Sequence, residues 1–164
     1  MGNNIASTIA VVDDSDYSTQ RKKPMPSFNH GSVQFNLSGL FYINYRKEYR
    51  VVSEVTFLLD DWHCVPDLSI LPHSNYDPTN DQIKTTEAPL GVVEILSPTQ
   101  SQSELVSKAR QYFQSGVQSV WIVFPELQNV YVFSSPVDYV IYRVGETLRD
   151  QSLTIELPVA EFFE

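Results

Sequence analysis

Glu94 is the residue whose surroundings most strongly indicate chemistry. It lies in the run 89–96, PLGVVEIL, in which it is the one charged residue. Such a run is typical of a central strand covered on both faces, and alternation places Glu94 on one face with Val92 and Leu96. A carboxylate there is costly to desolvate unless it is paired or binds a metal. Two interpretations stay open: a functional acid, or a structural ion pair near the strand end.

Asp67 is a second acid inside a predicted strand, which covers residues 65–71. Pro66 has no N–H for a strand ladder, so this strand begins there or lies at a sheet edge. Taken alone, Asp67 is a turn residue that opens the strand. Taken with Glu94, it forms a pair of strand-borne acids that could share one hard cation through oxygen ligands.

Lys108 is the third candidate, and it lies in a predicted helix over residues 101–115. It falls at the edge of the apolar arc of this helix, one turn before Tyr112. From there its ammonium could reach inward past the end of the central strand. The alternative is a surface lysine whose stem covers apolar neighbours. Glu104, one turn earlier, is the expected ion-pair partner of Lys108.

Glu54 is a possible additional site residue. It alternates with Val52 and Thr56 in a predicted strand over residues 49–59, so it could add a ligand or line a cleft. A half-exposed strand glutamate without a functional role fits the pattern equally well. His30, near the start of a predicted helix, is expected to cap or pack rather than to act in catalysis.

These residues need a scaffold that brings distant segments together. The pattern predicts a helix starting at Ser27 or Asn29, strands over 49–59 and 65–71 paired as an antiparallel hairpin, a loop over 72–88, a central strand over 89–96, a helix over 101–115 stopped by Gly116, strands over 117–124, 130–134 and 139–144, and one short strand in the tail 153–164. This order predicts a single α/β domain over residues 27–164, built around one sheet. Residues 1–26 are expected to form a partly flexible N-terminal arm.

Composition excludes several classes of protein. The chain has 164 residues, a net charge of −9 and a single cysteine, Cys64. One cysteine excludes an internal disulfide framework and a four-cysteine zinc site, and the acidic balance argues against a general nucleic-acid coat protein. Six of the eleven Lys and Arg residues lie among the first 65 residues, in clusters at 21–23 and 46–50. Because no leader or long apolar run is present, we expect a soluble cytoplasmic protein that does not bind membranes.

Four segments together carry a family resemblance. They are Pro66-Asp67, the run Val93 to Pro98 (VEILSP), Lys108-x-x-x-Tyr112-x-x-x-Gly116-Val117, and Val120-Trp121-Ile122-Val123. In order and spacing they resemble the putative restriction endonuclease domain family of bacteria, within the PD-(D/E)XK nuclease superfamily. The resemblance covers about residues 27–164 and implies a restriction-endonuclease-like fold, with a central mixed β-sheet flanked by helices.

The resemblance also implies a reaction, which is metal-dependent hydrolysis of DNA phosphodiester bonds. Asp67 and Glu94 would hold Mg²⁺ or Mn²⁺. The usual superfamily lysine, two residues after the glutamate, would fall at Leu96. The family is similar in having moved this lysine to the following helix, where Lys108 stands. Because cutting a duplex takes two strikes, a homodimer is expected by analogy.

Two alternatives to an enzyme remain open from the sequence. The first is a non-catalytic binding or regulatory protein on the same fold. The second is a small-molecule-binding α/β protein, which would need a deep apolar cleft closed to a duplex. Convergence of Asp67, Glu94 and Lys108 on one point would favour the enzyme.

Overall fold

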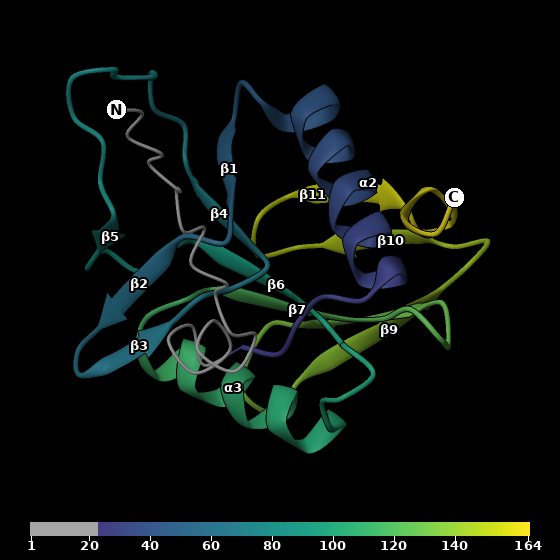
Figure 1. Ribbon diagram of the computed structural model, residues 1–164. Coiled ribbons are helices and arrows are strands. Elements are labelled where there is room, and N and C mark those ends of the chain that lie inside the picture. The colour runs from purple at the N-terminus through teal and green to yellow at the C-terminus, as the bar shows by residue number, and fades with distance from the viewer. Residues whose placement is uncertain (1–22) are drawn as a thin grey trace, which may run out of the picture.

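The structure is a computed structural model that describes residues 23–164. Of the predicted N-terminal arm over residues 1–26, only 23–26 therefore belong to the described residues, and the expected flexibility of 1–22 lies outside them. The element labels used below are those of Figure 1.

A six-stranded mixed sheet forms the centre of the domain, in the order β1-β4-β6-β7-β8-β9. Its strands are β1 (Tyr49–Ser53), β4 (Leu68–Pro72), β6 (Gly91–Ile95), β7 (Ser119–Phe124), β8 (Asn129–Phe133) and β9 (Tyr139–Arg143). Only β6 and β7 run parallel, and the other neighbours are antiparallel. The α/β class and the mixed central sheet predicted from the sequence are confirmed.

Two helices cover opposite faces of this sheet, α2 (Phe28–Tyr45) on one side and α3 (Gln102–Gln114) on the other (Figure 1). Alternation along β6 explains the division. Val93 and Ile95 share a buried cluster with residues of α2, whereas Val92 shares one with residues of α3. Every residue of β6 is buried, as predicted for a central strand. Glu94, two residues from Val92, therefore faces the α3 side.

Smaller elements complete the domain. A three-stranded sheet has the order β3-β2-β5, with β2 (Thr56–Leu59), β3 (Trp62–Cys64) and β5 (Lys84–Thr85). A two-stranded sheet pairs β10 (Thr147–Asp150) with β11 (Ile155–Pro158). A short 3₁₀ helix, η1 (Val159–Phe162), follows β11. The sequence pattern did not predict β10, because its residues TLRD lack a strand-like apolar run.

The predicted strand over 49–59 is in fact two strands in different sheets. The break falls at Glu54, whose φ of 60° is left-handed and ends the extended run. β1 pairs antiparallel with β4, as predicted for the two segments, but β2 turns away and pairs with β3. Glu54 is therefore a turn residue between two sheets, and the prediction of a continuous strand through it was wrong.

The caps of the two helices follow sequence signals. The Ser27 side chain accepts a hydrogen bond from the backbone N–H of His30 at the start of α2. At the start of α3, Ser101 and Glu104 form a reciprocal capping box. Gly116 has a φ of +95° just after α3, a conformation that stops a helix at low cost only for glycine. The helix that carries Lys108 is thus fixed at both ends by local sequence.

Replacing Ser101 by Ala is expected to lower the free energy of unfolding by about 1 kcal/mol, since it removes the N-cap acceptor of α3. Ser107→Ala, at an exposed position inside the same helix, is the matched control and should leave stability nearly unchanged. Urea unfolding followed by circular dichroism measures both. Equal midpoints for the two variants would show that the cap does not stabilise α3.

Candidate functional site

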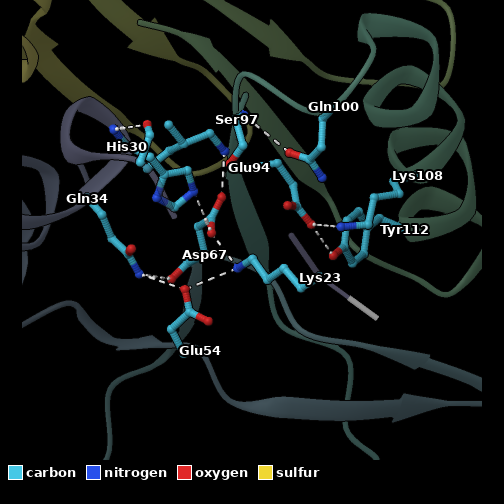
Figure 2. Close-up of polar contacts among 12 residues, drawn as sticks. Lys23, His30, Gln34, Glu54, Asp67, Glu94, Ser97, Gln100, Lys108 and Tyr112 are labelled. Carbon is cyan, nitrogen blue, oxygen red and sulfur yellow. Dashed lines mark hydrogen bonds and ion pairs between the residues drawn. The ribbon is translucent and has the colours of Figure 1, made fainter. Parts of the chain in front are cut away.

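Glu94 is buried with two donors from α3 on one of its oxygens (Figure 2). Its side chain is 2% exposed, and Oε1 accepts hydrogen bonds from Lys108 Nζ at 2.8 Å and from the Tyr112 hydroxyl at 2.6 Å. Lys108 and Tyr112 stand one helical turn apart, so a single helix face supplies both donors. Burial, together with the charge of Glu94, raises the pKa of Tyr112 well above its ordinary value. Tyr112 is therefore a neutral donor to the Glu94 carboxylate.

Lys108 points to Glu94 rather than to its neighbour on the helix. The expected ion pair between Glu104 and Lys108 is not formed; Glu104 instead accepts from the backbone N–H of Ser101 at 2.9 Å. A buried carboxylate without a counter-charge is costly, and this explains why Lys108 turns inward. Its side chain remains 27% exposed, so Lys108 joins the buried acid to the protein surface.

Asp67 is the second buried acid, and it lies just before β4. The prediction that it lies inside a strand over 65–71 was wrong, because β4 begins only at Leu68. The side chain of Asp67 is 1% exposed. Its Oδ1 lies 3.0 Å from His30 Nε2 and also contacts Lys23 Nζ. Oδ2 accepts from the backbone N–H of Ile95 at 2.7 Å. Burial alone would raise the pKa of Asp67, but the hydrogen bond from His30 and the charge of Lys23 outweigh it and hold that pKa below its ordinary value. Since Ile95 follows Glu94, this bond ties the two acids to one point of the sheet.

Glu54 joins the site from the turn after β1. Its Oε1 accepts from Gln34 Nε2 at 3.1 Å and from Lys23 Nζ at 3.1 Å. Gln34 Nε2 also donates to the backbone carbonyl of Asp67 at 3.0 Å, and the backbone N–H of Glu54 bonds the same carbonyl. The left-handed turn at Glu54 thus brings a third carboxylate beside Asp67.

The structure brings together all four residues singled out from the sequence, Asp67, Glu94, Lys108 and Glu54. Sequence reasoning missed three others. Their contacts with the site span long sequence separations, and they are Lys23, His30 and Gln34.

The missed residues left weak signals in the sequence. Lys23 lies in a basic cluster, which indicates charge but no particular contact. Packing is the role that the sequence predicts for His30, and its side chain is indeed buried, but it packs against the acid Asp67. The α2 pattern offered a clue, because His30 and Gln34 stand one turn apart on the helix.

Cys64 forms part of the wall on the α3 side. Burial, with the nearby charge of Glu94, raises the pKa of its thiol to about 12. The thiol is therefore protonated at neutral pH and is no nucleophile. The Trp62 ring lies beside Tyr112, with ring centroids 4.8 Å apart. This wall is apolar, so an unpaired charge next to it would cost more free energy than it would in water.

Carboxylate oxygens are the ligands that a hard divalent cation takes. Asp67, Glu94 and Glu54 offer such oxygens, and the Lys23 ammonium, itself a cation, contacts both Asp67 and Glu54. Over residues 23–164, no group of three or more His, Cys, Asp or Glu side chains is placed so that it could hold a metal ion. Mg²⁺ does not need one, because one or two carboxylates with several waters and a substrate phosphate hold it.

The fold and a family match together define the class of protein. The central mixed sheet is flanked by helices, with Glu94 in β6 and Asp67 just before β4. A model of the Uma2 family, described as "Putative restriction endonuclease", matches residues 19–162. The chain therefore belongs to this family, and the resemblance noted in its sequence is confirmed.

A solved structure has a similar fold. It is described as a putative nuclease belonging to DUF820 from Anabaena variabilis ATCC 29413. It is 22% identical, the match covers 85% of this chain and 83% of that one, and the TM-score is 0.74. No curated protein matches the chain. Within the described part of the chain, no helix has both the length and the apolar character needed to cross a membrane.

Replacing His30 by Ala is expected to lower the free energy of unfolding by about 2 kcal/mol, because it removes a buried partner of a charged carboxylate. His63→Ala is the control, since His63 is exposed and should change stability little. Urea denaturation at pH 7 measures both variants. A His30 variant as stable as the His63 variant would contradict the role given to His30 in holding Asp67.

Proposed function

We propose that the chain is a Mg²⁺- or Mn²⁺-dependent endonuclease that hydrolyses phosphodiester bonds in DNA. Its family membership supports the nuclease class. The observation that carries the proposal is the link between the two buried acids. Asp67 bonds the backbone N–H of Ile95, the residue next to Glu94, while Glu94 holds Lys108 at 2.8 Å. Two carboxylates and an ammonium at one strand end suit phosphoryl chemistry.

Asp67 and Glu94 would hold the cation, with Glu54 as an additional ligand. When bound, the cation would polarise a phosphoryl oxygen and lower the pKa of the attacking water. Specific contacts hold the Asp67 carboxylate. His30 Nε2 contacts Oδ1 of Asp67, and the backbone N–H of Ile95 donates a hydrogen bond to Oδ2. Both contacts limit rotation of the carboxylate, so the ligand oxygens are held in place before the cation arrives.

Lys108 would act on the substrate side of the site. Its ammonium is held by Glu94 yet is partly exposed, so it can face a phosphate that enters from solvent. There it would orient the attacking water and stabilise negative charge that develops on the phosphate. Tyr112 donates to the same Glu94 oxygen and fixes the carboxylate that positions Lys108. Tyr112 is a positioning residue in this scheme.

The charge of the chain limits where DNA could contact it. A chain with a net charge of −9 is repelled by DNA overall, so contact depends on local positive groups. Arg46, Lys47 and Arg50 are such groups at the junction of α2 and β1. A homodimer would present two sites to the two strands of a duplex and double these clusters. Binding is therefore expected to weaken as salt rises.

The test is cleavage of supercoiled plasmid and of single-stranded DNA at low salt, with Mg²⁺ or Mn²⁺. The unmodified chain should produce nicked and linear plasmid over time. Asp67→Asn should lose detectable cleavage, and Lys108→Met should slow it by about 100-fold, because it removes a donor that stabilises transition-state charge. Asp81→Asn, at an exposed loop position, is the matched control and should cleave at the original rate.

Two outcomes would contradict the proposal. Cleavage that persists unchanged in Asp67→Asn would mean that the activity does not come from this site. No cleavage by the folded chain with either metal would exclude the proposed endonuclease. DNA binding measured in the same samples by fluorescence anisotropy would then support the alternative of a non-catalytic binding protein.

A further inference from the structure

Lys23 is a buried amine that faces the acids of the site. Its side chain is 11% exposed, and its ammonium contacts Asp67 Oδ1 and lies 3.1 Å from Glu54 Oε1. The charge of Glu94 also acts on it: burial would lower the pKa of Lys23, but Asp67 and Glu94 outweigh burial and raise it. Figure 2 shows the Lys23 amine directed into the space between Asp67 and Glu54.

The Lys23 ammonium lies between Asp67 and Glu54, where a metal ion bound by these acids would lie. Asp67 and Glu94 are almost fully buried, at 1% and 2% exposure, and buried carboxylates need a counter-charge. Lys108 serves Glu94 from α3 and reaches neither of the other acids in the described structure. Lys23 is a cation that contacts both Asp67 and Glu54. An ammonium ion is a compact point charge with three donors, and in this respect it resembles a hydrated metal ion.

We propose that Lys23 is an internal counter-ion of the metal site, which occupies the cation position in the metal-free protein and leaves it when Mg²⁺ or Mn²⁺ binds. The inference rests on the proposed function, since it takes Asp67 as a ligand. The ammonium and the metal cannot both contact Asp67 Oδ1 closely, because two cations on one oxygen repel each other. Metal binding is therefore an exchange and not a simple addition.

The local backbone allows this exchange. Lys23 to Ser27 has no helix or strand, whereas α2 begins immediately after, at Phe28. Lys23 can therefore withdraw through its four-carbon stem and the short segment behind it, without unwinding α2. Once withdrawn, the ammonium stays near the site and adds positive charge where a substrate phosphate must approach. Lys23 thus compensates the acids before the metal binds and the phosphate afterwards.

The exchange predicts a metal affinity that is lower than the ligands alone would give. A site whose competent state is only partly populated binds with an affinity reduced by that fraction. Removing the competing ammonium in Lys23→Met should then tighten Mn²⁺ binding by about 10-fold or more. A purely structural ion pair predicts the reverse. In that case Lys23→Met would disturb Asp67 and weaken binding.

The experiment is titration of Mn²⁺ into the full chain by isothermal calorimetry, without DNA. Lys23→Met should bind more tightly than the unmodified chain, whereas Lys23→Arg, which keeps a cation there, should not. Lys84→Met is the matched control, because Lys84 is exposed and its loss should leave the affinity unchanged. Thermal unfolding gives a second measurement. Lys23→Met should melt lower than the unmodified chain without metal and should gain more from saturating Mn²⁺. Lys23→Gln replaces it if the Met variant does not fold.

The outcomes separate this inference from the proposed function. Equal Mn²⁺ affinity in Lys23→Met and the unmodified chain would overturn the counter-ion role while leaving the metal site intact. Weaker binding in Lys23→Met would also overturn it. A folded chain that binds no Mn²⁺ in any variant would overturn both proposals. Tighter binding in Lys84→Met as well would assign the effect to net charge and would overturn the specific role of Lys23.

Discussion

Burial of two carboxylates is the constraint on which the rest of the site depends. Asp67 lies just before β4 and Glu94 lies in the neighbouring strand β6, and both are almost inaccessible to solvent. Each unpaired buried charge would cost several kcal/mol or more. Each acid therefore needs hydrogen-bond donors or cations from the elements that pack around it. Asp67 collects them from α2 and from the backbone of β6, and Glu94 collects them from α3. The two helices are thus bound to the same point of the sheet from opposite faces.

The alternation of β6 produces this arrangement. Val93 and Ile95 pack on the α2 side, so the intervening Glu94 faces α3. The backbone N–H of Ile95 remains available to Asp67, because the end of β6 extends beyond its pairing with β4, which stops at Val93. A longer β4 would occupy this N–H with a ladder bond. The short pairing of β4 with β6 is therefore what lets an aspartate bind the strand end.

Features set by local periodicity were predictable from the sequence, and features set by long-range contacts were not. The two-residue period of a strand placed Glu94, and the helical period placed Lys108 beside Tyr112. In contrast, Lys23 meets Asp67 across 44 residues, and no pattern within either segment encodes that contact. The left-handed turn at Glu54 was also hidden, because the residues around it have high strand propensity. Tertiary packing overrides that propensity where two sheets diverge.

The charge balance at the site imposes an order on the proposed chemistry. Three carboxylates at one point repel a phosphodiester, so a phosphate can enter only after they have been neutralised. Lys108 pairs with Glu94, and its side chain remains partly exposed. Asp67 and Glu54 share Lys23, and a divalent cation that replaces it carries one charge more than the ammonium. In the proposed exchange, the metal adds one charge more than the ammonium that it replaces, and the released ammonium stays nearby with its own charge. The net charge of the site therefore rises by about two units. This rise comes when the site becomes able to receive a phosphate.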